Sequence, residues 1–272
     1  MTTLRWATPE WHPSLPSTNT RALADPRPGR VVVADHQSAG QGRRERRWES
    51  PPGTGMAISA VLPPVPVEVV GWVPLAAGLS VVAALRDSRW PVDAGVKWPN
   101  DVLVPLRDDR SRDDGPDDNP TQVPVLEHRG VRWGKVAGVL AQVAPTGAVV
   151  VGIGVNVDHT LEQLPVPTAT SWRLARGGAP LPDGAREDLL TSVLAHLATF
   201  HDALGAGDPG PVRTAYLAES LTLGSVVVVH RPDGGTTQGR AVGLDPSGAL
   251  VLEGLQGRTV HHAGDVEHLR PQ

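Results

Sequence analysis

The sequence predicts an α+β fold, with helices and strands mixed over the first two thirds of the chain and a small β-barrel at its end. At 272 residues the chain is long enough for one large domain and a small one. Apolar strands and amphipathic helices follow one another in the first part, whereas from Leu223 four or five short strands are separated by the turn sequences "PDGG", "DPSG" and "LQGR". We therefore expect a main domain over 1–220 and a small β domain over 221–272.

The first predicted element is a short helix over 17–25, where Ser17 and Thr18 are cap-forming residues. The β-branched run "GRVVVADHQ" (29–37) is typical of a buried strand. An arginine-rich loop joins it to "GMAISAVL" (55–62), whose alternation predicts the next strand.

A longer helix is expected over 72–88, followed by three strands. The segment "AGVKWPNDVLV" (94–104) is interpreted as one strand with a polar, proline-broken centre. The apolar runs 135–143 and 147–157 predict two neighbouring strands. Four aliphatic residues share one face of the expected helix, which predicts that this face is buried: Leu75, Leu79, Val82 and Leu85.

Two further segments complete the main domain. Residues 107–130 are acidic, contain prolines and have few apolar side chains, so we expect a mobile surface insertion there. An amphipathic helix is expected over 183–204, capped by Asp183. Its inward face is predicted to carry Leu189, Leu190, Val193, Leu194 and Leu197.

Composition excludes several classes of protein. A net charge of −4 disfavours a nucleic-acid binder, which is more often basic. The absence of cysteine excludes disulfides, thiolate metal sites and a cysteine nucleophile. We find no signal peptide and no apolar run of the roughly 18 residues that a membrane span needs. These observations predict a cytoplasmic protein that binds neither nucleic acid nor membrane.

The stretch "HQSAGQGRRERRW" has the chemistry of an anion-binding loop. Gly40 and Gly42 permit close approach of the backbone to a ligand. Four arginines follow within five positions, and guanidinium groups match phosphate oxygens in pairs. Trp48 is placed to stack on a base or to pack under the loop. The alternative is an exposed charged turn without a ligand.

Other polar groups are candidates only in combination. Asp101, in "VKWPND", is a candidate oxygen ligand for Mg²⁺, although Asn-Asp is also a common turn sequence. Lys135 could hold a fixed positive charge beside a phosphate, or face solvent at a strand edge. Gly138 lies within a predicted strand, which suggests a close approach to the backbone. We find no Rossmann fingerprint, Walker loop or nucleophile elbow.

In order, "STN", "HQ-x-AG-x-GR", "KWPND", "GK-x-AG" and "GIGVN" resemble the motifs of the biotin–protein ligases. The resemblance covers about 17–158, and the C-terminal module is similar to the small domain of that family. It implies a mixed-sheet catalytic domain of the class II synthetase type with a small C-terminal SH3-like β-barrel. It also implies that ATP, with Mg²⁺, activates biotin as biotinyl-5′-AMP. The biotinyl group then passes to a lysine on the biotin carboxyl carrier domain of an acyl-CoA carboxylase.

The resemblance implies a role for each motif residue. Lys135 corresponds to the catalytic lysine, and Arg43 to the catalytic arginine of the adenylate loop. Trp48 is expected to pack on adenine, and Asp101 is the candidate metal ligand. Biotin is expected to contact Ser17, Thr18, Asn19, Gln37, Gly138 and Gly154. The nucleotide is expected to contact Gly40, Gly42, Arg43, Arg46, Trp48, Lys97, Asn100 and Asn156.

Three departures from the family pattern stand out. Gln41 and Glu45 replace an arginine and a glycine of the usual loop, which should make it less cationic and less free in backbone. The linker between Asp101 and Lys135 is unusually long. We find no helix-turn-helix pattern ahead of the main domain, so we expect the monofunctional type, as a monomer or homodimer. Two rivals remain: a lipoate–protein ligase, which shares the architecture, and a non-catalytic nucleic-acid-binding module.

Overall fold

The main domain of the computed structural model is built around a mixed sheet of eight strands. Residues 1–3, 44–47, 49, 107–125, 256 and 270–272 lie outside the part of the chain that the structure describes. The strand order is β1-β2-β3-β8-β7-β5-β4, and β6 pairs with β7. β1 runs parallel to β2, and the other neighbours in this order are antiparallel, which confirms the predicted mixed α+β architecture. The strands are β1 (Glu10–His12), β2 (Val31–Ala34), β3 (Gly55–Leu62), β4 (Gly95–Lys97), β5 (Asp101–Pro105), β6 (Leu126–His128), β7 (Val131–Val143) and β8 (Val149–Asn156).

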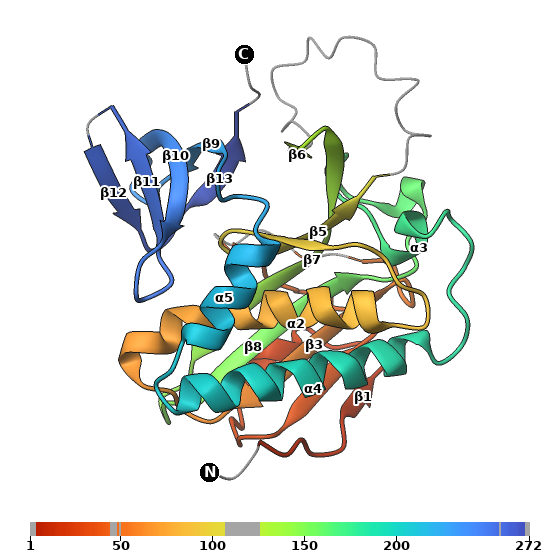
Figure 1. The fold of residues 1–272 in the computed structure, drawn as a ribbon. Helices are drawn as coiled ribbons and strands as arrows, with labels where there is room; N and C mark the ends of the chain where they lie inside the picture. Colours follow the sequence, from red (N-terminus) through yellow and green to blue (C-terminus); the bar gives the residue numbers. More distant parts are fainter. Residues whose placement is uncertain (1–3, 44–47, 49, 107–125, 256, 270–272) are drawn as a thin grey trace.

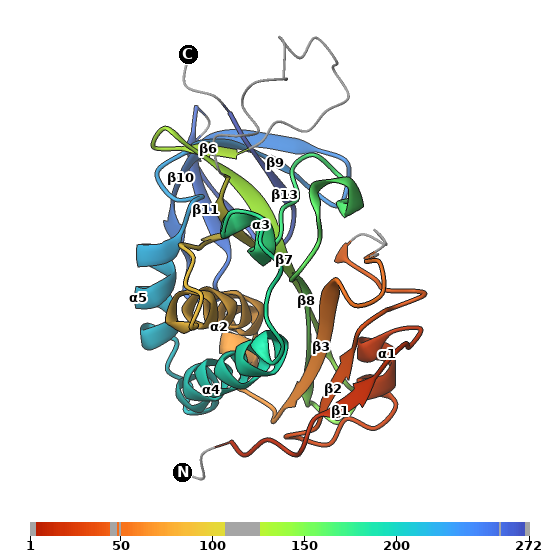
Figure 2. The same cartoon turned by 90° about the vertical axis from the view of Figure 1, so that its right-hand side faces the viewer.

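Helices cover both faces of this sheet unequally. Figure 2 shows α2 and α4 on one face and the short α1 on the other. α2 is the central core helix, because it contacts the sheet as well as α4 and α5. The four aliphatic residues predicted on its inner face are all buried, and each contributes about 1.5–3 kcal/mol by leaving water. The helices are α1 (Thr18–Leu23), α2 (Val73–Asp87), α3 (Trp172–Ala175), α4 (Ala185–Gly205) and α5 (Gly210–Glu219), with 3-10 turns η2 (Val67–Trp72) and η4 (Leu161–Gln163).

The continuous helical segment Val67–Asp87 is long and apolar enough to cross a membrane by length and composition alone. The sequence prediction, which considered unbroken apolar runs, did not anticipate this. Of its most apolar window, 67% is buried inside the protein, against the sheet and α4. The segment therefore serves as the core of the main domain.

The C-terminal part forms a second sheet, as predicted, with five antiparallel strands. Its order is β12-β11-β10-β9-β13, so β12 and β13 form its two edges. Two tryptophans of the main domain bind its β10–β11 turn: Trp72 Nε1 donates to the Pro246 carbonyl at 2.8 Å, and Trp98 Nε1 to the Gly248 carbonyl at 3.3 Å. The two parts thus share one apolar core. The strands are β9 (Val226–His230), β10 (Thr236–Leu244), β11 (Leu250–Gly254), β12 (Gly257–His261) and β13 (Asp265–His268).

Two local predictions were wrong. The expected single strand 94–104 is a hairpin, in which β4 and β5 pair antiparallel around a cis Trp98–Pro99 bond. The proline has no N–H to donate to a sheet, so the chain turns there. Asp183 does not cap α4; the cap position is Gly184, with a φ of 83° and no side-chain hydrogen bond.

The last five residues of the predicted insertion 107–130 are folded. Residues 107–125 lie outside the described residues, so the prediction of mobility is untested there. Residues 126–130 are ordered: β6 pairs with β7 through a two-residue turn in which Arg129 has φ 52° and Gly130 φ 75°. Two successive residues with positive φ are typical of a tight hairpin turn. β7 accordingly begins at Val131, four residues before the predicted strand start.

Candidate functional site

The main pocket has a volume of about 390 Å³, and α1 forms part of its wall. Elements distant in sequence form its wall: α1, the loop after β2, β3, the β4–β5 turn, β7, β8 and the segment 165–169. The pocket brings together most of the residues that the motifs singled out. Those on its wall are Ser17, Thr18, Asn19, Gln37, Gly42, Arg43, Trp48, Lys97, Asn100, Asp101, Lys135, Gly138, Gly154 and Asn156.

One end of the pocket is built from hydroxyl and amide groups. The Thr18 amide donates to Gln37 Oε1 at 2.8 Å, and the Thr18 hydroxyl donates to the same oxygen at 3.1 Å. Ser59 Oγ lies 2.8 Å from Thr18 Oγ1. Ser17 caps α1, since its side chain accepts a hydrogen bond from the Thr20 amide. These contacts fix the two polar side chains that open the helix.

Asn19 supports this end from behind. Its amide nitrogen donates to the Leu140 carbonyl and to Gln142 Oε1, and Ser59 Oγ lies 2.6 Å from Asn19 Oδ1. A side chain on Gly152 would meet the Asn19 amide group and force it to shift. Ser59 and Gly152 were not predicted as site residues. A serine within the apolar strand "GMAISAVL" was the available signal, because a buried hydroxyl needs a partner.

The other end of the pocket is charged. Lys135 Nζ lies 2.6 Å from Asp101 Oδ1, and both side chains are partly exposed, at 32% and 23%. The ammonium also lies 5.6 Å from the centre of the Trp48 ring, a cation–π distance. Sequence reasoning named all three residues, but it did not anticipate that the candidate metal ligand pairs with the candidate catalytic lysine.

The β4–β5 hairpin carries Asp101, and the neighbouring Asn100 attaches it to β7. Asn100 Nδ2 donates to the Val139 carbonyl at 2.9 Å, and the Val139 amide donates to the Asn100 carbonyl at 2.9 Å. A register shift between Val102 and Leu103 then alters the pairing of β5 with β7. Asn100 therefore positions the charged end.

The segment 165–169 covers the charged end and is held by two strands. The Lys135 amide donates to the Thr168 carbonyl, and the Thr170 amide donates to the Lys135 carbonyl, both at 2.8 Å. The buried Asn156 donates from Nδ2 to the Thr170 carbonyl at 2.9 Å. The backbone of Lys135 therefore holds the segment that shapes the pocket, and its side chain supplies positive charge to the pocket.

Trp48 lies on the pocket wall. Its indole covers Gly138 and Gly154, so that a side chain added to Gly154 would lie only 2.7 Å from Trp48 Nε1. It rests on the two glycines predicted to line the biotin pocket, and its packing on adenine stays a prediction. Gly40 lies behind the wall, against Gln37 and the Trp48 carbonyl. Arg46, predicted to bind the nucleotide, lies outside the described residues, as does Glu45.

His159 is buried three residues after the end of β8, where the chain leaves the sheet. Burial lowers the pKa of His159 to about 4, and the nearby Asp158 and the Thr54 carbonyl offset this only in part. The ring is therefore neutral at pH 7.

This burial predicts a pH-dependent stability. Between pH 6.5 and about pH 4 the unfolded chain binds a proton at His159 that the folded chain does not, so stability falls as the pH falls through this window. The loss approaches about 3 kcal/mol at its acid end, from roughly 1.4 kcal/mol per pKa unit. Thermal unfolding at several pH values should show this slope in the wild type and a flatter one in His159→Gln. Parallel slopes in the two proteins would contradict it.

Comparison with known proteins identifies the family. Residues 11–158 match the biotin/lipoate A/B protein ligase family, and residues 222–269 match the biotin protein ligase C-terminal domain. The chain belongs to the biotin/lipoate A/B protein ligase family. The first match spans the pocket residues from Ser17 to Asn156, and the second spans all five strands of the small sheet.

Relatives in this family match over most of the chain. A biotin–[acetyl-CoA-carboxylase] ligase of Mycobacterium tuberculosis is 36% identical over 250 residues, covering 89% of this chain and 80% of that one. A ligase of the same name from Paracoccus denitrificans is 31% identical, covering 86% and 88%. A bifunctional ligase/repressor of Bacillus subtilis is 27% identical, and the match covers only 66% of that protein.

Solved structures agree with the fold. The biotin protein ligase of Aquifex aeolicus in complex with biotin and ATP superposes with a TM-score of 0.73 at 25% identity, covering 98% of this chain and all of that one. The biotin protein ligase of Leishmania major, in complex with biotinyl-5-AMP, has a TM-score of 0.58 at 21% identity, which supports the fold alone.

Proposed function

We propose that this chain is an ATP-dependent ligase that activates biotin as biotinyl-5′-AMP and transfers it to a lysine of a biotin carboxyl carrier domain. The observation that carries the proposal is the two-ended pocket, with hydroxyl and amide groups at one end and Lys135 at the other. The Mycobacterium tuberculosis relative, 36% identical, is a biotin–[acetyl-CoA-carboxylase] ligase. The carrier is accordingly proposed to belong to an acyl-CoA carboxylase.

The pocket's chemistry suits a carboxylate that must react with a phosphate. The two anions repel each other, so a fixed cation is needed at the point where they meet. Lys135, on β7 next to the segment 165–169, supplies this cation. Arg43 adds a guanidinium group on the wall of the same pocket. Apolar side chains such as Ile58, Val139 and Ile153 offer a surface for the ring of biotin. We assign the ureido group to Ser17, Thr18 and Gln37.

The remaining site residues are assigned by their positions. Gly138 and Gly154 form the floor beneath Trp48, and Gly40 and Gly42 allow the loop to approach its ligand. Lys97, Asn100, Asn156 and, outside the described residues, Arg46 are assigned to the nucleotide. Asn19 is assigned a supporting role at the biotin end, because its amide is already engaged by β7.

Mg²⁺ is proposed to accompany ATP. Among the described residues no group of three or more histidine, aspartate or glutamate side chains could hold a metal ion. Asp101 is a single carboxylate, and Mg²⁺ is often bound by one or two carboxylates together with substrate phosphates and water. The residues therefore fit a metal that arrives with the nucleotide, for which Asp101 would be the protein ligand.

The division of the chain is part of the proposal. We assign catalysis to a domain over 1–220 and the small sheet to a domain over 221–272. We also propose that the enzyme is cytoplasmic and binds neither nucleic acid nor membrane. Its proposed oligomeric state is a monomer or a homodimer. Light scattering of the purified chain, with and without biotin and ATP, would measure the oligomeric state.

The proposal is tested by the substrate that releases pyrophosphate. Incubation of the chain with ATP and Mg²⁺ should release pyrophosphate when biotin is added and much less when lipoate is added. Release with lipoate alone would identify a lipoate–protein ligase instead. Tight, salt-dependent binding to nucleic acid without any response to biotin would contradict both.

Arg43→Gly should weaken retention of the adenylate. Loss of a charged hydrogen bond to phosphate costs about 1.5–3 kcal/mol, which corresponds to roughly a tenfold or greater increase in the rate of release. Biotinyl-5′-AMP formed in situ is followed after rapid dilution into excess unlabelled biotin. If the variant holds the adenylate as long as the wild type does, Arg43 is not the residue that retains it.

A further inference from the structure

The segment that joins α5 to the small β domain extends the main sheet past its last strand. β4 ends the strand order of this sheet and has only three residues. Beyond it, Ser220 forms a parallel bridge with Val96, and the Leu221 amide donates to the Val96 carbonyl at 2.9 Å. Figure 1 shows α5 leading into the small sheet at this place. Residues 220–222 therefore hold the outer edge of β4.

Thr222 contacts the start of the β4–β5 turn. Its hydroxyl oxygen accepts a hydrogen bond from the Trp98 amide at 3.0 Å, and both residues are buried. A backbone N–H that is buried away from water needs an acceptor, and leaving it without one is costly. A side chain of the joining segment thus supplies the acceptor for the amide with which the turn begins.

The segment that carries Thr222 is itself held on both sides. Before it, Glu219 Oε1 lies 2.6 Å from Arg86 Nη1 at the end of α2. Ser220 Oγ accepts a hydrogen bond from the Thr222 amide at 3.3 Å, and the Thr222 carbonyl accepts one from the Ser225 amide at 3.2 Å. These contacts fix the backbone of Thr222, so its hydroxyl presents the Trp98 amide with an acceptor at a set position.

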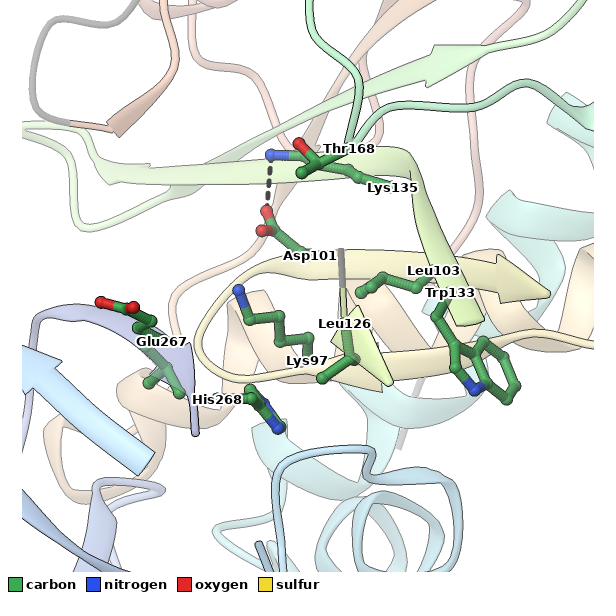
Figure 3. Close-up of a pocket in the computed structure, with 10 residues that line it drawn as sticks. Lys97, Asp101, Leu103, Leu126, Trp133, Lys135, Thr168, Glu267 and His268 are labelled. Carbon is green, nitrogen blue, oxygen red and sulfur yellow. Dashed lines mark ion pairs between the residues drawn. The ribbon is translucent and has the colours of Figure 1, made fainter. Parts of the chain in front are cut away.

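The turn that Thr222 holds leads directly to the acidic partner of Lys135. Asp101 follows Trp98 by three residues and is the first residue of β5. Figure 3 shows its carboxylate turned toward the Lys135 amine, and the two groups lie 2.6 Å apart. The strength of such a pair depends on its separation, so a displaced turn would change the charged end of the pocket.

We propose that Thr222 is a positioning residue for adenylate formation: its hydroxyl holds the Trp98 amide and thereby keeps Asp101 against Lys135. This inference rests on the proposed function, because the reaction that it serves is the activation of biotin by ATP. The side chain of Thr222 is not on the wall of the main pocket, so it acts through the turn and not by contact with a substrate.

The hydroxyl and amide end of the pocket rests on other elements. α1, which carries Thr18, contacts β2, β3 and β8, whereas β4 lies at the opposite end of the strand order. Loss of the Thr222 hydroxyl should therefore disturb the end that is assigned to the nucleotide and leave the biotin end in place. A residue that served only the overall stability of the fold would affect both ends alike.

Thr222→Val tests this difference, because it keeps nearly the same shape and removes the acceptor. At saturating biotin, kcat/KM for ATP in pyrophosphate release should fall by roughly tenfold, while the Kd for biotin without ATP stays within about twofold of wild type. Thr222→Ser keeps the hydroxyl and should stay within about threefold of wild type in both measurements. Thr259→Val is the matched control, since it removes a hydroxyl that lies 2.9 Å from His261 Nε2 on the far strand β12, and it should change neither.

A second comparison tests whether Thr222 acts through Asp101. In an Asp101→Asn background, Thr222→Val should lower kcat/KM for ATP by less than about twofold, because the carboxylate that the hydroxyl positions is already gone. Residues that act independently multiply their effects. The same roughly tenfold loss in both backgrounds would therefore show that Thr222 does not act through Asp101.

The wild type and the variants separate the two proposals. If the wild type releases no pyrophosphate with biotin, the proposed function fails, and the role of Thr222 fails with it. If the wild type is active and Thr222→Val keeps its kcat/KM for ATP, or loses biotin binding to the same extent, only the role of Thr222 is overturned. Melting temperatures are measured for every variant, and Thr222→Ala takes the place of Thr222→Val if the latter does not fold.

Discussion

Lys135→Ala should reduce adenylate formation by about 100- to 1,000-fold, because it removes the fixed positive charge at the junction of the pocket's two ends. Pyrophosphate release with saturating biotin and ATP measures this loss. The fold should persist, since the side chain is 32% exposed and its strand is held by backbone hydrogen bonds.

Lys135→Met separates charge from packing. It keeps an unbranched stem of similar length without the ammonium, so it should lose as much activity as Lys135→Ala. Substantial pyrophosphate release in Lys135→Met, with an unchanged melting temperature, would show that the ammonium is not the catalytic group.

Gly154→Val should weaken biotin binding by roughly 10- to 100-fold, because overpacking of this kind costs about 1–3 kcal/mol. The added side chain would meet the Trp48 indole and displace it from the pocket floor. The KM for biotin measures the effect, and the KM for ATP should change less. Gly243→Val is the matched control, because a side chain there meets nothing within 4 Å. Equal KM values for biotin in the two variants would remove Gly154 from the biotin site.

The sequence predicted most of the pocket because its residues fall in short motifs on strands or next to them. Lys135, Asp101 and Asn156 are recognisable from their neighbours alone. The prediction failed where structure depends on contacts between distant segments. Nothing in "VKWPND" shows that Asn100 binds the backbone of β7.

Longer-range features were also beyond the sequence. The predicted insertion was extended over Leu126 because its composition is polar on average, although the final residues form a hairpin with β7. Leu103 of the main sheet and Val266 of the small sheet line one small cavity together, which no local pattern indicates. Trp48 was assigned to adenine by resemblance, and only the packing against Gly154 shows where its ring rests.

The carrier protein provides the most direct test. The purified chain is incubated with ATP, Mg²⁺, biotin and a biotin carboxyl carrier domain, and the mass of the carrier is measured. We predict a gain of one biotinyl group on a single lysine, which depends on ATP and is lost with Lys135→Ala. An unchanged carrier mass, with the wild-type chain folded and biotin in excess, would contradict the account.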